Sequence, residues 1–308
     1  MKLTINAGKI TRAVKTVIYG TEGVGKSTLA SQFPGALFID VEGGTSQMDV
    51  RRIEAPKSWS ELVEIVNEVS KTPGICETLI LDTADWAEQM LIQHICKKYN
   101  QKSIESFGYG KGYTYIGEEW QQLMKAFDAV KDAGMNVTII AHARQRKIEL
   151  PDQAGAFDHW EMKLSKQVAP LLKEWADLLL FLNYKTFVVT TDSNSKKAQG
   201  GKRVMYTSHN PVYDAKNRHG LPDELDLSFD GIAHIFSKIE TVKQQTPQER
   251  LAELMAEAGI EEYQLRNLVA SRGKQDAETP VSEYDDKFVR GYCLKNWDAI
   301  VNTIRNEE

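Results

Sequence analysis

The stretch GTEGVGKST, residues 20–28, decides the fold. It follows the apolar run KTVIYG (15–20) and leads into STLASQF (27–33), so it joins a short buried strand to a helix. Its spacing fits G-x-x-x-x-G-K-[ST], in which backbone N–H groups curl around phosphate oxygens. A chance glycine-rich turn is the alternative, and the flanking strand and helix argue against it. We therefore predict a phosphate-binding loop made of Gly20, Thr21, Glu22, Gly23, Val24, Gly25, Lys26, Ser27 and Thr28.

The residue types in this loop indicate a nucleotide with a metal ion. Lys26 is expected to reach the β- and γ-phosphates, and the Ser27 hydroxyl to hold Mg²⁺. A second metal-side ligand is expected at the end of a neighbouring strand, and TLILD (78–82) supplies Asp82 there. The alternative is that Asp82 caps the helix that follows it. We predict ATP and Mg²⁺ as cofactors, although the sequence does not show which base is bound.

A further pair of acids ends another strand. ALFIDVEGG (36–44) carries Asp40 and Glu42, which point the same way if both lie on the strand. A carboxylate beyond the strand end can orient and activate an attacking water, so we predict that Glu42 is the catalytic base. A solvated strand end is the alternative.

Strands and helices alternate through the first part of the chain. Further strands are expected at 136–142, in the apolar run that ends at 184, and in a hairpin around the polar loop 192–201. Helices are expected at 58–71 and 120–134. This alternation predicts an α/β fold, with a mostly parallel, doubly wound sheet.

After residue 242 the sequence pattern changes from alternating strands and helices to helices alone. Thr246 as N-cap, Pro247 at the first helical position and Glu249 mark a helix start, and Gly259 and Gly273 end two helices. A third helix is expected over residues 284–304. We predict an ATPase core at 1–242 and a small helical domain at 243–308, which carries a net charge of −4 out of −5 for the chain.

Composition narrows the function classes. The chain has 308 residues, 42% hydrophobic and 26% charged, without an apolar run long enough to span a bilayer. Its first residues lack the apolar region of a signal peptide, and its three cysteines show no metal-binding spacing. We expect a cytoplasmic protein with reduced thiols and no membrane partner.

These motifs resemble those of the RecA-like ATPases. In that family a glutamate after a strand activates water, which corresponds to Glu42, and Asp82 matches the metal-side acid. VTIIAHARQRK (137–147) resembles the strand that leads into the family's second DNA-binding loop, where a polar γ-phosphate sensor, often Gln, usually stands. His142 stands at this position, so the sensor role is altered, and a hydrogen-bonded core histidine is the alternative.

AKNRHG (215–220) strengthens the resemblance. RecA-like assemblies carry a Lys-x-Lys or Lys-x-Arg pair that reaches the γ-phosphate bound by the neighbouring subunit, and bacterial RadA proteins carry a similar Lys-Asn-Arg-Phe-Gly. Lys216 and Arg218 match this pair, and His219 replaces Phe. The resemblance implies a homo-oligomer, ring or filament, with trans-acting Lys216 and Arg218; a solvated charge cluster is the alternative. The compact core and helical tail are most similar to bacteriophage recombination and single-strand annealing ATPases, which places such a protein in the bacterial host cytoplasm.

Two segments are candidates for contact with single-stranded DNA. By position the first loop is 103–119, with Lys111 and Tyr113, and the second is 144–163, with Arg144, Arg146 and Lys147. Aromatic rings stack on bases and cations pair with phosphates. A lid over the nucleotide or a packed loop is the alternative for the first segment.

The resulting hypothesis is a DNA-stimulated ATPase of recombination or annealing, which a single-strand DNA-binding protein would accompany. Three alternatives stay open. One is a ring-forming helicase or branch-migration ATPase. The second is a P-loop kinase that does not act on DNA and works as a monomer. The third is a nucleotide-switched scaffold whose assembly ignores DNA.

Overall fold

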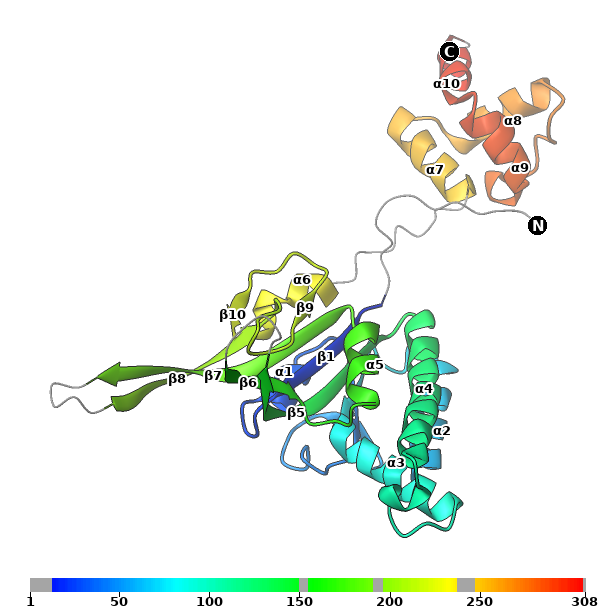
Figure 1. Ribbon diagram of the computed structural model, residues 1–308. Coiled ribbons are helices and arrows are strands. Elements are labelled where there is room, and N and C mark those ends of the chain that lie inside the picture. The colour runs from blue at the N-terminus through cyan, green and yellow to red at the C-terminus, as the bar shows by residue number, and fades with distance from the viewer. Residues whose placement is uncertain (1–12, 150–154, 191–195, 237–246, 307–308) are drawn as a thin grey trace. The chain divides into compact units, whose positions relative to one another are not determined.

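The computed structural model describes residues 13–149, 155–190, 196–236 and 247–306. The chain divides into two compact units, Met1–Ser237 and Lys238–Glu308, and each is described by itself (Figure 1). No helix within these described ranges is long and apolar enough to cross a membrane.

The first unit is built on one large sheet. Its strand order is β10-β8-β7-β1-β5-β4-β2-β3, with β6 paired to β5 and β9 paired to β7. The six neighbours from β7 to β3 run parallel, and β6, β8, β9 and β10 join antiparallel. The strands are β1 (Lys15–Gly20), β2 (Ala36–Asp40), β3 (Arg51–Ile53), β4 (Thr78–Asp82), β5 (Asn136–Glu149), β6 (Ala156–Met162), β7 (Leu178–Thr190), β8 (Lys196–Tyr206), β9 (Lys216–Asn217) and β10 (Glu224–Asp226).

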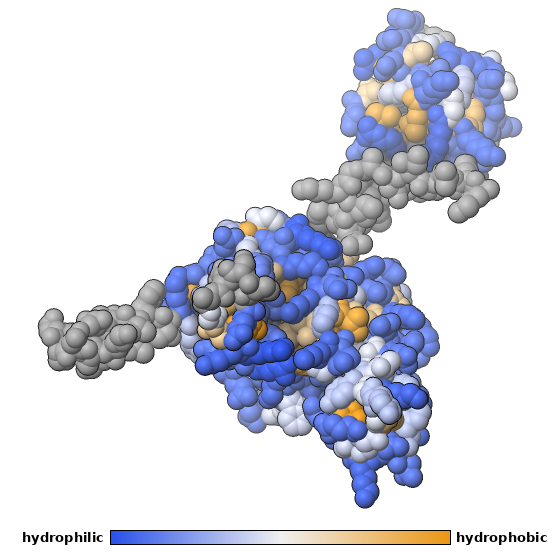
Figure 2. All heavy atoms as spheres, in the orientation of Figure 1, coloured by the Kyte–Doolittle hydropathy of each residue, from blue (hydrophilic) through white to orange (hydrophobic). Residues whose placement is uncertain are grey.

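Helices cover both faces of this sheet, which explains why its strands read as continuous apolar runs. Helices α2 to α5 bury one core cluster with Val17 and Tyr19, and α1 and α6 bury the opposite cluster with Ile18. The face in view in Figure 2 is mainly hydrophilic, as this burial requires. The helices are α1 (Lys26–Ala30), α2 (Trp59–Ser70), α3 (Ala84–Lys98), α4 (Lys111–Asp132), α5 (Val168–Trp175) and α6 (Ala233–Phe236).

The predicted α/β core is confirmed, with differences at three places. Strand β5 continues seven residues past His142 and pairs with β6 as a hairpin, so the expected loop 144–163 is wrong. Helix α4 begins at Lys111, inside the expected loop 103–119, after the short turn η1 (Ile104–Phe107). Strand β8 begins at Lys196, so more than half of the expected polar loop 192–201 is strand.

The second unit is helical. It consists of α7 (Pro247–Ala258), α8 (Glu262–Ser271), η3 (Val281–Glu283), α9 (Asp286–Phe288), the π-helical turn η4 (Val289–Leu294) and α10 (Trp297–Asn306). Gly259 and Gly273 adopt φ of +68° and +65° where α7 and α8 end, as expected of helix-ending glycines. The expected third helix is divided into α9, η4 and α10, and Thr246 lies outside the described residues. This unit has a core of its own around Leu251, Leu265 and Ile300.

Candidate nucleotide-binding site

A cavity of about 290 Å³ lies at the carboxyl ends of β1, β2 and β4, with His142 of β5 in its lining. Parallel strands bring these ends to the same edge of the sheet, so residues far apart in sequence gather there. The cavity is lined by Gly23, Gly25, Lys26, Ser27, Thr28, Glu42, Gly44, Met48, Asp82, Thr83 and His142.

The phosphate loop turns from β1 into α1 through left-handed glycines. Gly23 and Gly25 have φ angles of +71° and +109°, which residues other than glycine seldom adopt. Lys26 is 6% exposed, and its ammonium donates to the carbonyl oxygens of Gly20 and Thr21 at 3.2 and 3.0 Å. Burial lowers the pKa of Lys26, against the opposing pull of nearby carboxylates led by Asp82. The loop thus places its cation at the wall of the cavity.

The two predicted metal ligands touch each other. The Ser27 hydroxyl donates to Asp82 Oδ2 at 2.6 Å. Burial raises the pKa of Asp82 to about 6; the carboxylates of Asp40 and Glu42 add to the rise, and the Ser27 hydrogen bond opposes it. A hydroxyl and a carboxylate converging in a buried, acid-rich place fit Mg²⁺, which takes oxygen ligands. The alternative role of Asp82 as a helix cap is not found, because Thr83 is the N-cap of α3.

Glu42 and His142 face each other across the cavity. His142 Nε2 lies 3.9 Å from Glu42 Oε1, and the Thr83 hydroxyl donates to Glu42 Oε2 at 3.4 Å. Strand β2 ends at Asp40, so the expectation that Asp40 and Glu42 point the same way is wrong. Asp40 instead accepts the N–H groups of the turn from Gly43 to Thr45, whereas Glu42 lines the cavity together with Asp82.

Asp85 holds His142 in place. It accepts the His142 backbone N–H at 3.0 Å and lies 2.9 Å from Nδ1, so the ring presents Nε2 toward Glu42. Burial acts to raise the pKa of Asp85, but the hydrogen bonds from His142 outweigh it and leave the pKa lowered. His142 is therefore both a buried, hydrogen-bonded histidine and a wall of the cavity. Asp85 is not among the predicted site residues. The sequence feature that points to it is its position, an acidic residue three positions after Asp82.

A family model described as an AAA domain matches residues 12–219, more than half of the chain. The chain belongs to this family. The AAA domain covers the cavity and its lining residues described above. Together they make the chain a P-loop ATPase.

The chain is also similar to several solved structures at low sequence identity. They include the RadB recombinase (15% identity, 65% of this chain and 82% of that chain, TM-score 0.36). A KaiC-like protein from Pyrococcus horikoshii OT3 shares 11% identity (68% and 83%, TM-score 0.37). The flagellar accessory protein FlaH from Methanocaldococcus jannaschii shares 12% (70% and 85%, TM-score 0.37). No curated protein matches the chain. The predicted α/β P-loop fold with a mostly parallel sheet is confirmed by the strand order and by the family match.

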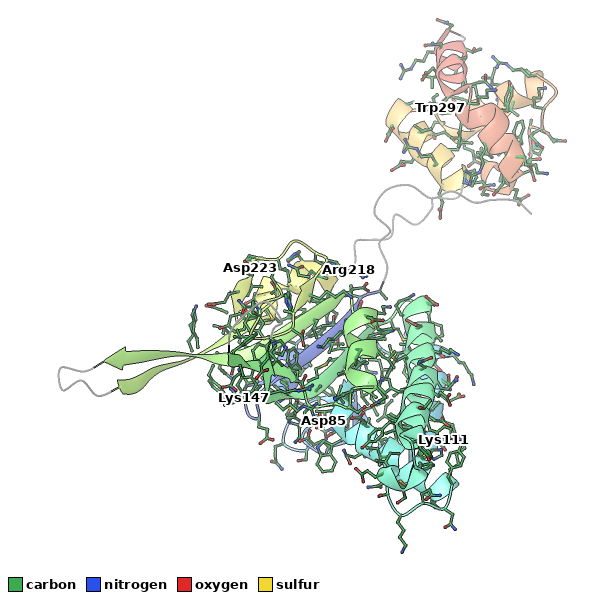
Figure 3. All side chains as sticks on the ribbon, viewed as in Figure 1. Asp85, Lys111, Lys147, Arg218, Asp223 and Trp297 are labelled. Carbon is green, nitrogen blue, oxygen red and sulfur yellow. The ribbon has the colours of Figure 1, made fainter. Side chains whose placement is uncertain are left out.

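Lys216 and Arg218 lie away from the cavity of their own chain. Lys216 on β9 pairs with Leu179, near the start of β7, and its ammonium donates to the carbonyls of Lys173 and Glu174 at 3.0 and 2.9 Å. Arg218 donates to Asp177 at 3.1 Å and is 55% exposed. Figure 3 shows Arg218 at the upper end of the core unit, well apart from Asp85. Both cations thus sit at the edge of the sheet where β7 begins.

The four cations and one tyrosine proposed to contact DNA do not form one surface. Lys111 and Tyr113 lie in the first turn of α4, and Tyr113 packs on the core and donates to Glu105. Figure 3 shows Lys111 and Lys147 on opposite sides of the core unit. The hairpin β5–β6 carries Arg144, Arg146 and Lys147, and all three are exposed. Arg144 is bound to Glu161 and to the Leu164 carbonyl, which leaves Arg146 and Lys147 as its more available cations.

Proposed function

We propose that this ATPase hydrolyses ATP between copies of itself, on single-stranded DNA, in recombination or strand annealing. Lys26 would hold the phosphates, Ser27 and Asp82 would hold Mg²⁺, and Glu42 would orient the attacking water. Mg²⁺ would neutralise charge on the phosphates when bound. His142 would contact the γ-phosphate side of the cavity through Nε2.

The position of Lys216 and Arg218 carries the intersubunit part of the proposal. Strand β7 pairs with β1 from Leu178 to Leu182, and the phosphate loop begins at the Leu182 end. Four residues of strand separate the two ends by about 13 Å, and β9 lies on the far side of β7 from β1. The pair therefore does not reach the phosphates of its own chain. In a head-to-tail assembly it would meet the cavity of the next copy, where two cations stabilise charge on the transferred phosphoryl group.

The present contacts of the pair allow this exchange. Lys216 binds the carbonyls at the C-terminal end of α5, which carry partial negative charge, and Arg218 pairs with one carboxylate. A triphosphate offers both cations stronger charge-assisted bonds than these. The contacts with α5 and Asp177 would hold the pair extended until a neighbour arrives.

The hairpin β5–β6 supports the DNA part of the proposal. Strand β5 runs from His142 in the cavity into the hairpin, and Arg146 and Lys147 stand on its exposed half. These cations suit the phosphates of a single strand. Lys111 and Tyr113 on α4 would form a separate contact at most. The acidic helical unit would meet a single-strand DNA-binding protein or another partner.

Mixing two inactive variants tests the intersubunit site. Lys26→Ala removes the phosphate lysine, and Lys216→Ala removes the trans-acting cation, so each alone should lose turnover. In a one-to-one mixture with a head-to-tail interface, about a quarter of the protomers combine an intact loop with an intact neighbour and regain activity. A mixture of Lys26→Ala with the double variant Lys26→Ala/Lys216→Ala is the matched control and should stay inactive.

The same assay, run with and without single-stranded DNA over a range of protein concentrations, tests whether turnover depends on assembly and on DNA. Turnover should rise steeply with concentration and increase with DNA. A rate per protomer that ignores concentration, DNA and Lys216→Ala would refute the proposal and point to the monomeric kinase. Concentration dependence without a DNA effect would point to the nucleotide-switched scaffold.

A further inference from the structure

The side chains of Tyr184 and Arg203 contact the phosphate loop from outside the cavity. The Tyr184 hydroxyl donates to the Gly23 carbonyl at 3.1 Å, and Arg203 Nη1 donates to the Val24 carbonyl at 3.4 Å. Tyr184 on β7 and Arg203 on β8 are direct cross-strand partners in this antiparallel pair. One pair of neighbouring side chains thus binds two consecutive carbonyls of the loop.

The planarity of the peptide bond gives these contacts a consequence inside the cavity. The Val24 carbonyl and the Gly25 N–H belong to one trans peptide unit, so they point in opposite directions. A donor that fixes the carbonyl on the outside therefore turns the Gly25 N–H toward the inside. Gly25 lines the cavity, and N–H groups at this position of the loop are those that bind phosphate oxygens.

The backbone of Gly25 needs these outside contacts because a glycine restricts its own conformation very little. Its φ of +109° lies where glycine has wide freedom. A Cβ on Gly25 would lie 3.1 Å from Arg203 Nη1 and 3.4 Å from Leu227 Cδ2, so these two side chains occupy the space that a side chain at residue 25 would fill. The guanidinium packs against the glycine and binds the carbonyl before it.

We propose that Arg203 and Tyr184 are positioning residues for nucleotide binding, which set the phosphate loop by holding its Val24 and Gly23 carbonyls from outside. Neither side chain belongs to the predicted phosphate loop, and their ligand is that loop rather than the nucleotide. The inference rests on the nucleotide-binding part of the proposed function, and does not depend on DNA or on a neighbouring copy.

Titration calorimetry of the full chain with ADP·Mg²⁺, at low protein concentration and without DNA, tests the proposal. Arg203→Met should weaken binding about tenfold and Tyr184→Phe about threefold, in line with the loss of one hydrogen bond each. Arg203→Lys keeps a donor and should recover part of the loss. Lys202→Met is the matched control, because Lys202 is the next cation on β8 and pairs with Asp226 instead of the loop.

Hydrogen exchange separates positioning from general damage. In the nucleotide-free Arg203→Met variant, amides of residues 23–26 should exchange faster, while those of β1 and β4 keep their wild-type rates. A dissociation constant within twofold of wild type, or an equal loss in Lys202→Met, would overturn the inference and leave the proposed function standing. A wild-type chain that does not bind ADP·Mg²⁺ would overturn both.

Discussion

Replacing Asp82 by asparagine should make the core unit more stable while ending its metal-dependent hydrolysis. Asp82 is 2% exposed, and burial raises its pKa to about 6. Its folded-state pKa lies above the unfolded value of about 3.9, so ionised Asp82 destabilises the fold at neutral pH. Asparagine keeps an oxygen for the Ser27 hydroxyl and removes the charge.

The size of the gain follows from this difference in pKa. At pH 7.5 the ionised side chain costs the folded state about 3 kcal/mol, which the variant should recover. At pH 5 the wild-type carboxyl is mostly protonated in the folded state, and the difference should shrink to about 1.5 kcal/mol. Lowering the pH therefore reduces the advantage of the variant.

Urea unfolding followed by tryptophan fluorescence measures this difference. Trp297 is the one tryptophan of the second unit, and the other five lie in the first, so a Trp297→Phe background reports on the core unit alone. The measurement is made without nucleotide and with a chelator, which keeps ligand binding out of the comparison.

Asp85→Asn is the matched control, because Asp85 is also buried but its pKa is lowered by His142. It should lose about 2 kcal/mol at pH 7.5, because hydrogen bonds to an ionised group disappear. The reasoning would be refuted if Asp82→Asn were no more stable than the wild type at pH 7.5. It would also be refuted if the gain in stability were the same at pH 7.5 and at pH 5.

Three further changes probe the cavity, the loop and the hairpin. Glu42→Gln should keep ADP binding within threefold and lower turnover about 100-fold or more, measured by phosphate release, because it removes the proposed base; equal turnover would exclude Glu42 as the base. Gly20→Ala should destabilise the core by about 1–3 kcal/mol in urea unfolding, because its Cβ would lie 2.4 Å from the Leu182 carbonyl oxygen; an unchanged midpoint would contradict this packing. Replacing Arg146 and Lys147 together by alanine should lower the slope of log affinity for single-stranded DNA against log salt by about 1.4, as expected for two lost phosphate contacts, and an unchanged slope would place DNA elsewhere.

The sequence predicts the elements whose patterns are strong and local. Strands β1 and β4 and helix α2 follow from the apolar patterns of their sequences, and in the structure Ser58 caps α2. The sequence does not predict the start of α4, because the glycines around Lys111 are typical of a loop. Position 112 requires a glycine because α4 passes close to η1: a Cβ there would lie 2.6 Å from the Ile104 carbonyl oxygen. This contact is tertiary, so no local pattern could show it.

The site divides in the same way. Lys26, Ser27 and Asp82 lie in motifs, so their spacing alone places them together. Asp85 meets His142 only because β5 lies between β1 and β4 in the sheet, an order that the sequence does not state. The exposed half of β5 is predicted as a loop, because charged residues dominate it and leave no alternating apolar pattern that would indicate a strand.

Each unit contains a buried cysteine whose reaction with a thiol reagent reports on the unfolding of that unit. Cys76 is buried in the first unit and Cys293 in the second, and burial raises the pKa of each thiol to about 11. A thiol reagent at neutral pH needs both access and thiolate, so each of these sulfurs reacts at the rate at which its surroundings unfold. Once the partly exposed Cys96 is replaced by serine, labelling at Cys76 and at Cys293 times the opening of the ATPase core and of the helical unit separately, in one sample of otherwise unmodified protein.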